Sequence, residues 1–208
     1  MKNNTIILIM LTILLIGFNA KLLLKAKDQE SASNSKYKEL QKELEQNEKR
    51  YRNNFHFETQ NEQLYLDKNL KLIGIDGDTV FAKNVFNNAK LVLRYTESNC
   101  RMCIDAEHDI LIQNANNIKE NVAVLSTYDR LRGAFMDAKK LAKSGLKNIE
   151  IYLVPYALKL PLEQQNIPYY FVVNKNLRVS SLLVPAKEDP KLSMHYVKSI
   201  LKNLNHEK

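Results

Sequence analysis

The two cysteines of this chain lie in a single C-x-x-C motif, as Cys100 and Cys103, where a short apolar run gives way to a helical pattern. Leu91–Leu93 is typical of a buried central strand, and Ile104–Ile118 carries apolar side chains at helical spacing. A cysteine at a helix N-terminus faces unpaired backbone N–H groups and the positive end of the helix dipole, which stabilise its thiolate. Two cysteines separated by two residues on that first turn close a disulfide with little backbone movement. The motif in this context predicts a dithiol site, with Cys100 as the exposed nucleophile and Cys103 as the resolving thiol.

The composition argues against several other classes of protein. A secreted disulfide scaffold needs more cysteines at longer spacings, and a structural zinc site needs a second ligand pair that the sequence lacks. The net charge of +8 comes from lysines spread along the chain, which indicates a solvated basic surface. The sequence has no Gly-rich phosphate loop, no Ser-His-Asp signature and no basic patch interleaved with aromatic residues. It therefore predicts no cofactor, no metal and no nucleic acid.

The N-terminal segment, residues 1–27, is predicted to be a membrane anchor. Ile6–Phe18 is an uncharged apolar run preceded by Lys2, as in the n-region of an export signal, and Leu22–Leu24 extends it past a single lysine. A bulky ring stands where a cleavage site needs a small residue, which favours an uncleaved signal anchor over a cleaved signal peptide. The lysines that flank the run favour the opposite topology, because positive charge prefers the cytoplasmic side.

Residues 28–67 are predicted to form a helical stalk. The segment is rich in Glu, Lys, Gln and Asn and contains no Pro or Gly. Tyr37, Leu40, Leu44 and Tyr51 follow one another at helical spacing, which indicates a solvated helix that lifts the next domain off the membrane. The same seam allows a weak coiled-coil homodimer as the alternative.

The rest of the chain, residues 68–208, is predicted to be one α/β domain. Alternating or short continuous apolar runs bounded by turn residues indicate strands, and helical spacing that stops at Gly145 indicates a helix between them. The expected strands are 70–75, 79–86, 90–95, 122–126, 149–154, 169–173 and 178–184, and the expected helices are 104–118, 128–144 and 192–204. Strands that alternate with helices, followed by a hairpin and a final helix, indicate a central sheet flanked by helices.

At these positions the chain resembles the thioredoxin superfamily, and more narrowly the membrane-tethered TlpA-like thiol–disulfide oxidoreductases. Ile75–Val80 is similar to the Asp-x-x-Gly hairpin that precedes the first central strand of that family, and Leu91–Tyr95 is similar to the strand before its active site. Ile167–Val173 resembles the segment that holds a cis-proline opposite the dithiol, and Asn174–Val179 resembles the turn and strand that follow it. Val184–Lys187 is similar to small thioredoxin-like proteins of the Bacteroidetes.

This resemblance, which covers residues 70–204, implies a thioredoxin-like fold with a central mixed sheet, preceded by a transmembrane helix and a helical stalk. It implies that Pro168 is the cis-proline that shapes the substrate groove, while an ordinary trans-proline at the start of a strand stays open. Pro168, Ile167 and Arg101 are the expected substrate-binding residues. Asn99 stands where the family commonly has Trp.

These observations predict thiol–disulfide exchange on protein disulfides or dithiols, carried out by Cys100 and Cys103. The resemblance places the protein in the bacterial inner (cytoplasmic) membrane as a single-pass protein, with the thioredoxin-like domain facing the periplasm. Arg101 is expected to lower the pKa of the Cys100 thiol and to make the disulfide more oxidising. The alternative is a redox-inactive or copper-binding module that presents a partner surface at the membrane, because copper carriers of this fold combine a cysteine pair with a distant His.

Four further polar residues bear on these alternatives. Asp105 and Glu107 closely follow the dithiol and are candidates to move a proton for Cys103. His108 lies five residues after Cys103, which does not match one helical face, so it is expected on the solvated surface. His195 is also expected on the surface, on the last helix.

Overall fold

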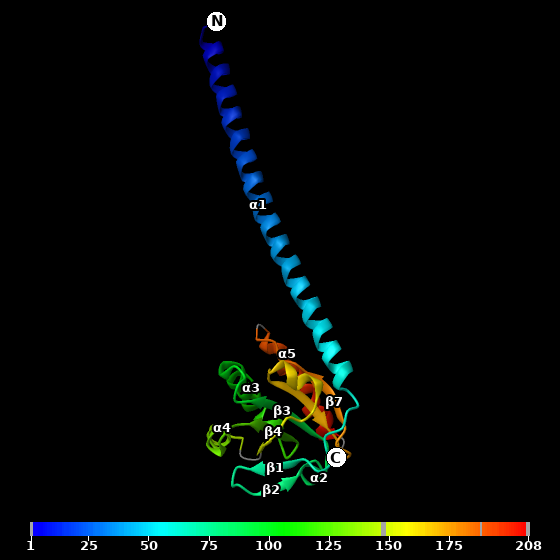
Figure 1. Ribbon diagram of the computed structural model, residues 1–208. Helices are drawn as coiled ribbons and strands as arrows, with labels where there is room; N and C mark the ends of the chain where they lie inside the picture. Colours follow the sequence, from blue (N-terminus) through cyan, green and yellow to red (C-terminus); the bar gives the residue numbers. More distant parts are fainter. Residues whose placement is uncertain (1, 147–148, 188, 207–208) are drawn as a thin grey trace. The chain divides into compact units, whose positions relative to one another are not determined.

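The computed structural model of the protein describes residues 2–146, 149–187 and 189–206, with the side chains of residues 2–20 described only in part. The chain divides into two compact units, one that ends at Tyr51 and one that begins at Arg52. Helix α1 (Lys2–Asn61) forms the first unit and continues into the second (Figure 1). The second unit therefore begins upstream of residue 68, the expected start of the globular domain.

Helix α1 extends over most of the predicted stalk. No helix in the described part of the chain is long and apolar enough to span a membrane. The apolar run Ile6–Phe18, on which the membrane anchor is predicted, lies largely on residues whose side chains are outside that part. The anchor therefore stays a prediction.

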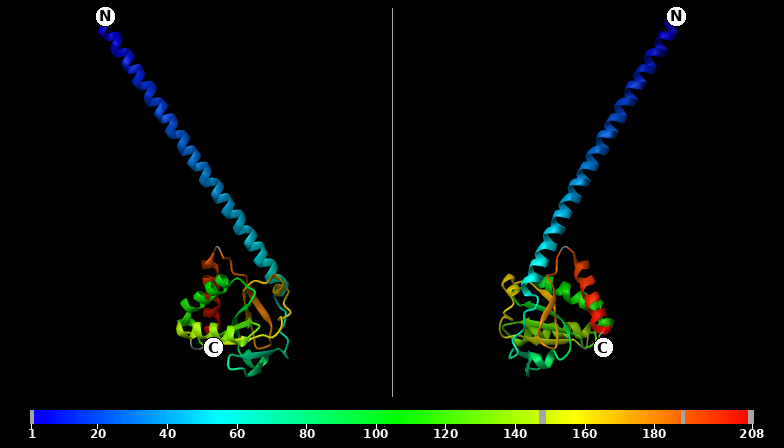
Figure 2. Two further views of the ribbon diagram at one scale, coloured as in Figure 1. Left: turned by 60° about the vertical axis from the view of Figure 1, so that its left-hand side comes forward. Right: turned by 90° about the vertical axis from the view of Figure 1, so that its right-hand side faces the viewer.

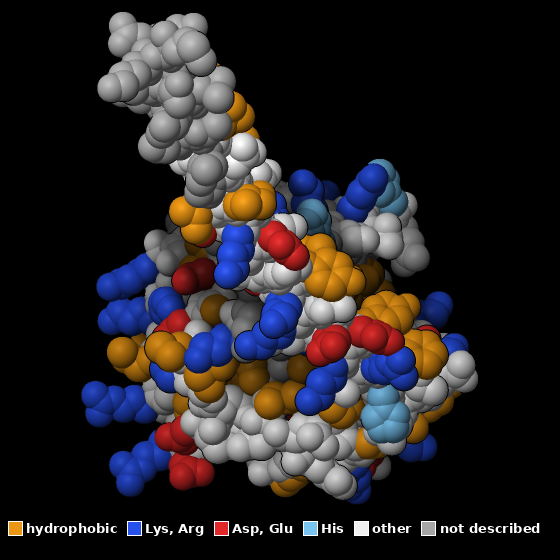
Figure 3. Space-filling model, turned by 90° about the horizontal axis from the view of Figure 1, so that it is seen from above, with side chains coloured by type: hydrophobic (Ala, Val, Ile, Leu, Met, Phe, Trp, Pro, Cys, Tyr) orange, Lys and Arg blue, Asp and Glu red, His pale blue; other side chains and the backbone are white. Residues whose placement is uncertain are grey.

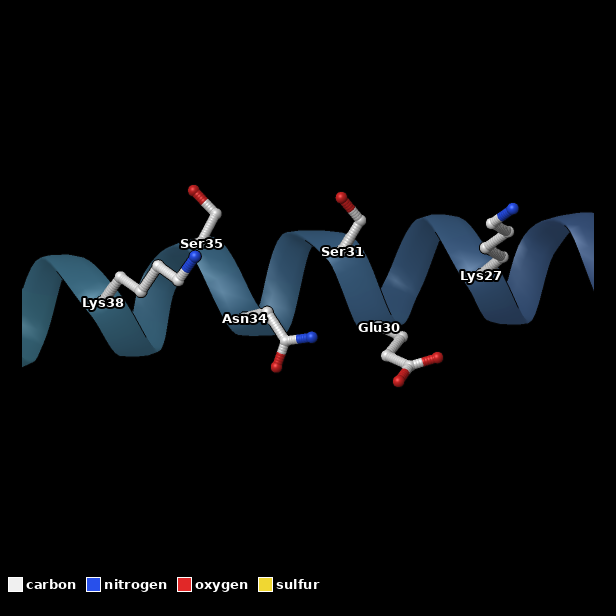
Figure 4. A pocket seen from close by; sticks show the side chains of 6 residues that line it. All are labelled: Lys27, Glu30, Ser31, Asn34, Ser35 and Lys38. Carbon is white, nitrogen blue, oxygen red and sulfur yellow. The ribbon is translucent and has the colours of Figure 1, made fainter.

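The exposed part of α1 presents two kinds of surface. The apolar seam residues Tyr37, Leu40 and Leu44 are each more than half exposed. Polar side chains between Lys27 and Lys38 line a shallow hollow, and Figure 4 shows that they all come from this one helix and do not converge. A hollow with walls from a single helix gives a ligand little enclosure, so we assign no site to it.

The second unit contains the remaining elements. Its strands are β1 (Lys71–Gly74), β2 (Thr79–Phe81), β3 (Lys90–Thr96), β4 (Val122–Thr127), β5 (Glu150–Leu153), β6 (Tyr169–Val173) and β7 (Val179–Leu183). Its helices are α2 (Ala82–Val85), α3 (Arg101–Gln113), α4 (Leu131–Lys143) and α5 (Pro190–His206), with the 3₁₀ turns η1 (Ala115–Asn117) and η2 (Pro161–Gln165). Each expected strand and helix is present, with ends that differ by a few residues.

The strands form one mixed sheet in the order β2-β1-β5-β4-β3-β6-β7. β3 and β4 are parallel, as are β4 and β5, because helical crossovers connect them. β6 is antiparallel to β3, and β7 is antiparallel to β6, as in a hairpin. A β3–α3–β4 unit followed by the β6–β7 hairpin and α5 is the thioredoxin-like arrangement, so the fold is thioredoxin-like α/β.

Two apolar clusters cover the two faces of this sheet. Successive side chains of a strand point to opposite faces, so Val92 belongs to one cluster and Leu91 and Leu93 to the other. Helices α3, α4 and α5 supply buried residues to the second cluster, and α3 and α5 lie side by side on that face (Figure 2). The burial of β3 on both faces explains its apolar run Leu91–Leu93, and the N-terminus of α3 follows the carboxyl end of this strand.

The N-terminal hairpin differs from the prediction in its second strand. The sequence predicts a strand over 79–86, but β2 ends at Phe81 and the one-turn helix α2 follows. The N–H of Ala82 donates to the carbonyl of Leu70, and the N–H of Phe86 donates to the carbonyl of Ala82. This turn buries Ala82, Val85 and Phe86 together, which a straight strand would leave on alternating faces.

On one face of the protein, the charged side chains that the structure describes are mixed in sign. On the face shown in Figure 3, Lys and Arg side chains are interspersed with Asp and Glu side chains. This distribution agrees with the solvated basic surface expected from the sequence.

Candidate dithiol site

The C-x-x-C motif lies at the N-terminus of α3, after the end of β3, as predicted. Cys100 is the N-cap residue, and its carbonyl accepts hydrogen bonds from the N–H groups of Cys103 at 3.0 Å and Ile104 at 3.1 Å. Cys100 is exposed, Cys103 is half-buried, and neither forms a disulfide in this structure. A substrate can therefore reach the Cys100 sulfur directly, while Cys103 lies behind it on the first turn of the helix.

The two thiols have pKa values that move in opposite directions. A hydrogen bond from the Cys103 thiol, supported by the Cys103 backbone N–H, lowers the pKa of Cys100. The same shared hydrogen raises the pKa of Cys103, and burial and the negative charge of Glu107 raise it further. The exposed thiol is therefore the first to ionise, and the half-buried thiol keeps its proton.

Arg101, the first residue between the cysteines, is held by two carboxylates. Its Nη2 atom lies 2.7 Å from Asp137 Oδ1 and 2.9 Å from Asp105 Oδ1, and its Nη1 donates to the Tyr128 hydroxyl at 3.3 Å. Partial burial disfavours the charge, but the hydrogen bonds to Asp137 and Asp105 outweigh it and raise the pKa of Arg101 above its usual range. The guanidinium is therefore committed to neighbours within the domain.

The expectation that Arg101 lowers the pKa of the Cys100 thiol stays a prediction. Lys187, in the loop between β7 and α5, is a cation that lowers this pKa, after the hydrogen bonds from Cys103. Lys187 is far from the motif in the sequence, and only the fold brings its charge to the dithiol. The expected contact between Arg101 and a substrate stays a prediction.

Asp137 on α4 is the centre of a buried polar network beside the dithiol. Its side chain accepts hydrogen bonds from the Tyr95 hydroxyl at 2.8 Å, the Tyr128 hydroxyl at 2.6 Å and Arg101 at 2.7 Å. Burial alone would raise the pKa of Asp137, but the donors, with Arg101 first, outweigh it and lower the pKa. The network ties the first turn of α3 to α4 and to the end of β3.

Glu107 lies one helical turn after Cys103 and is buried, with 5% of its surface exposed. The Ser193 hydroxyl donates to its Oε1 at 3.4 Å, while its Oε2 has no hydrogen-bond partner in the described part of the structure. Burial raises the pKa of Glu107 to about 7, although hydrogen bonds from Tyr170 and Ser193 oppose the shift. A carboxyl that exchanges a proton near neutral pH therefore lies beside the resolving thiol.

His108 is fully buried, so its expected place on the solvated surface is wrong. His108 lies four residues after Ile104 and three before Leu111, so the three side chains share the buried face of α3. The expectation used only the spacing between His108 and Cys103, which does not determine whether His108 is buried. The ring meets Tyr95 edge-on, with centroids 5.4 Å apart, and neither ring nitrogen has a hydrogen-bond partner among the described residues. Burial lowers the pKa of His108 to about 4, so the ring is neutral at physiological pH.

Pro168 is buried at the entry to β6, and the bond that precedes it is trans, because no described peptide bond is cis. The expected cis-proline is therefore wrong, and the alternative of a trans-proline before a strand holds. Asn166 has the left-handed conformation, with φ 50° and ψ 46°, and it turns the chain before Ile167. After that turn the strand can start from the trans form, which is intrinsically favoured by about 0.5–1 kcal/mol.

Asn166 also connects this loop to the cysteine loop, in a group that we call the asparagine clamp (Thr96, Ser98, Asn99 and Asn166). The Asn99 amide Nδ2 donates to the carbonyl of Asn166 at 2.8 Å and to its Oδ1 at 2.9 Å. The hydroxyls of Ser98 and Thr96 lie 2.7 Å and 3.1 Å from the same Oδ1. The structure thus brings the segment before Cys100 against the segment before Pro168.

Sequence reasoning missed Asn166, Asp137 and Lys187 as neighbours of the dithiol. The only local signal was Asn166, since Asn is the residue other than Gly that most readily adopts the left-handed conformation. His195 is exposed on α5, as expected. The described residues include no group of three or more His, Cys, Asp or Glu side chains that could hold a metal ion.

Comparisons with known proteins give matches among solved structures alone. No family model and no curated protein matches the sequence. A SCO1/SenC family lipoprotein from Bacillus anthracis is 14% identical, with a TM-score of 0.48 over 69% of this chain and 95% of that one. A putative electron transport protein from Aquifex aeolicus is 12% identical, with a TM-score of 0.47 over 71% of this chain and 99% of the other. The thioredoxin domain of a thiol-disulfide oxidoreductase from Bacteroides vulgatus is 16% identical, with a TM-score of 0.44 over 66% and 98%.

Proposed function

We propose that the protein carries out thiol–disulfide exchange on protein substrates through Cys100 and Cys103. The observation that carries the proposal is the position of the two thiols at the N-terminus of α3, where Cys100 is exposed as the N-cap residue and Cys103 is half-buried on the first turn. The lowered pKa of Cys100 and the raised pKa of Cys103 agree with this arrangement. An attacking thiol must be ionised and accessible, whereas a resolving thiol must keep its proton until the mixed disulfide has formed. The N-terminus of α3 supplies both conditions within one turn.

In the reductive direction, the Cys100 thiolate attacks one sulfur of the substrate disulfide. The substrate S–S bond breaks, the other substrate sulfur leaves as a thiolate, and a mixed disulfide forms with Cys100. Cys103 then loses its proton, and its thiolate attacks the Cys100 sulfur. The Cys100–Cys103 disulfide forms, the second substrate sulfur leaves, and the substrate has gained the two electrons that the protein has lost. An oxidised protein runs the same steps in reverse on a substrate dithiol.

Glu107 is the proton acceptor for Cys103 in this scheme. Its carboxyl has a pKa of about 7, so it is ionised in part of the population at neutral pH and can take the proton. Its negative charge raises the pKa of the Cys103 thiol, which places the two groups within electrostatic reach. Asp105 is a poorer acceptor, because it is bound to Lys140 at 2.8 Å and to Arg101.

Trapping of mixed disulfides tests the order of attack. The Cys103→Ser protein should accumulate a mixed disulfide at Cys100 when it is mixed with a disulfide-bonded protein, because nothing resolves it. The Cys100→Ser protein should trap little, because its remaining thiol is half-buried, and burial and the charge of Glu107 still raise the pKa of that thiol after Cys100 is removed. Equal trapping by the two variants, or trapping by neither, would exclude an ordered two-cysteine mechanism and favour a redox-inactive binding module.

We also propose that residues 1–27 anchor the protein in the bacterial inner membrane, with the domain in the periplasm. The uncharged run Ile6–Phe18 supports the proposal, as does the continuous helix α1 that links this segment to the domain. A thiol reagent that cannot enter the cytoplasm should label Cys100 in intact cells after mild reduction. Labelling that requires cell lysis would show that the lysine flank has reversed the orientation.

A weak homodimer through the stalk is the remaining part of the proposal. The exposed seam residues Tyr37, Leu40, Leu44 and Tyr51 would be covered by a second copy of α1. Sedimentation of the full chain in detergent should show a concentration-dependent dimer that Leu40→Asn and Leu44→Asn together abolish. A monomer at every concentration would exclude it.

A further inference from the structure

The asparagine clamp fixes the orientation of one amide group beside the dithiol. The backbone N–H of Thr96 can only donate, and it points at the Asn99 side-chain oxygen at 2.9 Å. The other end of that side chain, Asn99 Nδ2, therefore faces Asn166 and needs acceptors there. It finds the carbonyl and Oδ1 of Asn166, so the Asn166 oxygen must lie on the clamp side.

The Asn166 nitrogen consequently points away from the clamp. Asn166 is exposed, and its Nδ2 has no hydrogen-bond partner in the part of the chain that the structure describes. The Asn166 Nδ2 group carries two N–H donors. Their direction is fixed, because the hydroxyl and amide groups that donate to Oδ1 fix the orientation of the whole side-chain amide. An exposed donor that is already oriented loses little conformational entropy when it binds an acceptor.

The loop that carries Asn166 is held from its other side by a buried ion pair. Arg94 of β3 is 1% exposed, and its Nε lies 2.7 Å from Oε1 of Glu163 in η2. The N–H of Asn166 donates to the carbonyl of Glu163 at 3.3 Å. β3 therefore positions both loops of the site. The carboxyl end of this strand leads to Cys100, and Arg94 holds the loop that carries Asn166.

We infer that Asn166 is a substrate-binding residue, whose Nδ2 group donates to a backbone carbonyl of the peptide segment that carries the attacked sulfur. The inference rests on the proposed exchange reaction and specifies its substrate class as extended peptide disulfides. Asn99 is bonded to Asn166 and adjoins Cys100, with Cα atoms about 3.8 Å apart. A peptide linked through sulfur to Cys100 carries a backbone carbonyl on each side of its cysteine, and one of these carbonyls is the acceptor that the inference assigns to Asn166 Nδ2.

Two uncharged disulfide probes test for the hydrogen bond between Asn166 Nδ2 and a peptide carbonyl. Diacetylcystine bis(methylamide) carries peptide carbonyls beside its sulfurs, and bis(2-hydroxyethyl) disulfide has none. The readout is the ratio of the rates at which the two probes oxidise the reduced full-length protein. This ratio cancels any change in the reactivity of the Cys100 thiolate itself, because that change affects both probes.

The test variant is Asn166→Asp, which keeps an acceptor oxygen for the clamp, tolerates the left-handed conformation and removes the N–H donors. A net hydrogen bond contributes about 0.5–1.5 kcal/mol, so the ratio of peptide rate to hydroxyethyl rate should fall about two- to thirteenfold. Asn176→Asp makes the same charge change at an exposed turn and should leave the ratio unchanged. An unchanged ratio in Asn166→Asp overturns the inference while the exchange reaction stands. A wild-type protein that reacts with neither probe overturns the exchange reaction itself.

A second measurement does not depend on the folding of that variant. In Cys103→Ser protein, the side-chain amide protons of Asn166 are followed by NMR in the mixed disulfides with each probe. They should shift downfield in the peptide adduct and stay in place in the hydroxyethyl adduct. Identical amide shifts in the two adducts would overturn the inference.

Discussion

Glu107 and His108 are adjacent buried groups whose ionisation costs oppose each other as pH changes. Burial raises the pKa of Glu107 from 4.5 to about 7 and lowers the pKa of His108 from 6.5 to about 4. Each difference between the folded and unfolded chain is about 2.5 in pKa, or about 3 kcal/mol at about 1.4 kcal/mol per unit. The two residues should therefore make large and opposite contributions to the pH dependence of the free energy of unfolding, and these contributions largely cancel in the wild-type protein.

The sign of each contribution follows from proton linkage. Glu107 binds its proton more tightly in the folded chain, so its stabilisation is full below pH 4.5 and is lost as pH rises to about 7. His108 binds its proton less tightly in the folded chain, so its stabilisation is full above pH 6.5 and is lost as pH falls to about 4. Between these limits one contribution grows while the other declines, and the sum stays nearly constant.

Single substitutions should expose each contribution. Glu107→Gln keeps the amide shape and removes the carboxyl titration, so the free energy of unfolding should fall by about 3 kcal/mol between pH 7 and pH 4. His108→Phe keeps a ring against Tyr95 and removes the imidazole titration, so stability should instead fall by a similar amount as pH rises from 4.5 to 7.5. The double variant should again have a flat profile.

Urea unfolding followed by far-ultraviolet circular dichroism measures these free energies at each pH, with a phosphine reductant present to keep the dithiol reduced. The comparison of interest is the slope of the unfolding free energy against pH, which is insensitive to constant packing effects of either substitution. Wild-type and Glu107→Gln profiles that run parallel from pH 4.5 to 7 would refute the reasoning, since Glu107 would then ionise alike in both states.

Three further predictions concern residues around the dithiol. Lys187→Met should raise the pKa of Cys100, seen as slower alkylation at neutral pH, whereas Lys191→Met on the exposed start of α5 should not. Gly133→Ala would place a Cβ 2.3 Å from Tyr128 Cδ1, so it should cost about 1–3 kcal/mol in urea unfolding; no loss would show that the ring moves freely. Arg94→Met should cost about 3 kcal/mol because it leaves Glu163 buried without its cation, and adding Glu163→Gln should recover most of that loss.

The sequence predicts the order of strands and helices because the residues that each element buries are apolar and recur at the spacing of that element. β6 is apolar throughout and β3 has the apolar centre Leu91–Leu93, since both faces of these strands are covered, and the helix over 131–143 ends where Gly145, with φ 98°, reverses the chain. The same reasoning fails after β2. Ala82, Val85 and Phe86 pack together as the single turn of α2, and such a short apolar run cannot be distinguished from the continuation of a strand by alternation alone.

The site is predicted only as far as it is local in the sequence. Cys100 and Cys103 lie where the strand–loop–helix pattern puts them, but the expected roles of His108 and Pro168 depended on distance along the chain or on resemblance. The burial of His108 follows from the face that α3 turns toward the sheet. The trans bond of Pro168 comes two residues after a left-handed turn at Asn166, which sequence reasoning did not weigh.

The charged residues near the dithiol show why the sequence predicts only the local part of the site, since contacts made by the fold decide which charges act on the thiols. Arg101 is next to Cys100 in the sequence, yet its guanidinium reaches Asp137, a buried carboxylate that would be unstable without its cation. Among the described residues Lys187 has no ion pair with a buried carboxylate, and its charge lowers the pKa of Cys100 from a different loop. The described ion pairs of Arg101 commit its charge to carboxylates of the domain, whereas the charge of Lys187 acts on the Cys100 thiol. Because α4 supplies one of the two competing anions and α3 supplies the other, Asp105, only the double variant Asp105→Asn, Asp137→Asn should free Arg101 to lower the pKa of the Cys100 thiol.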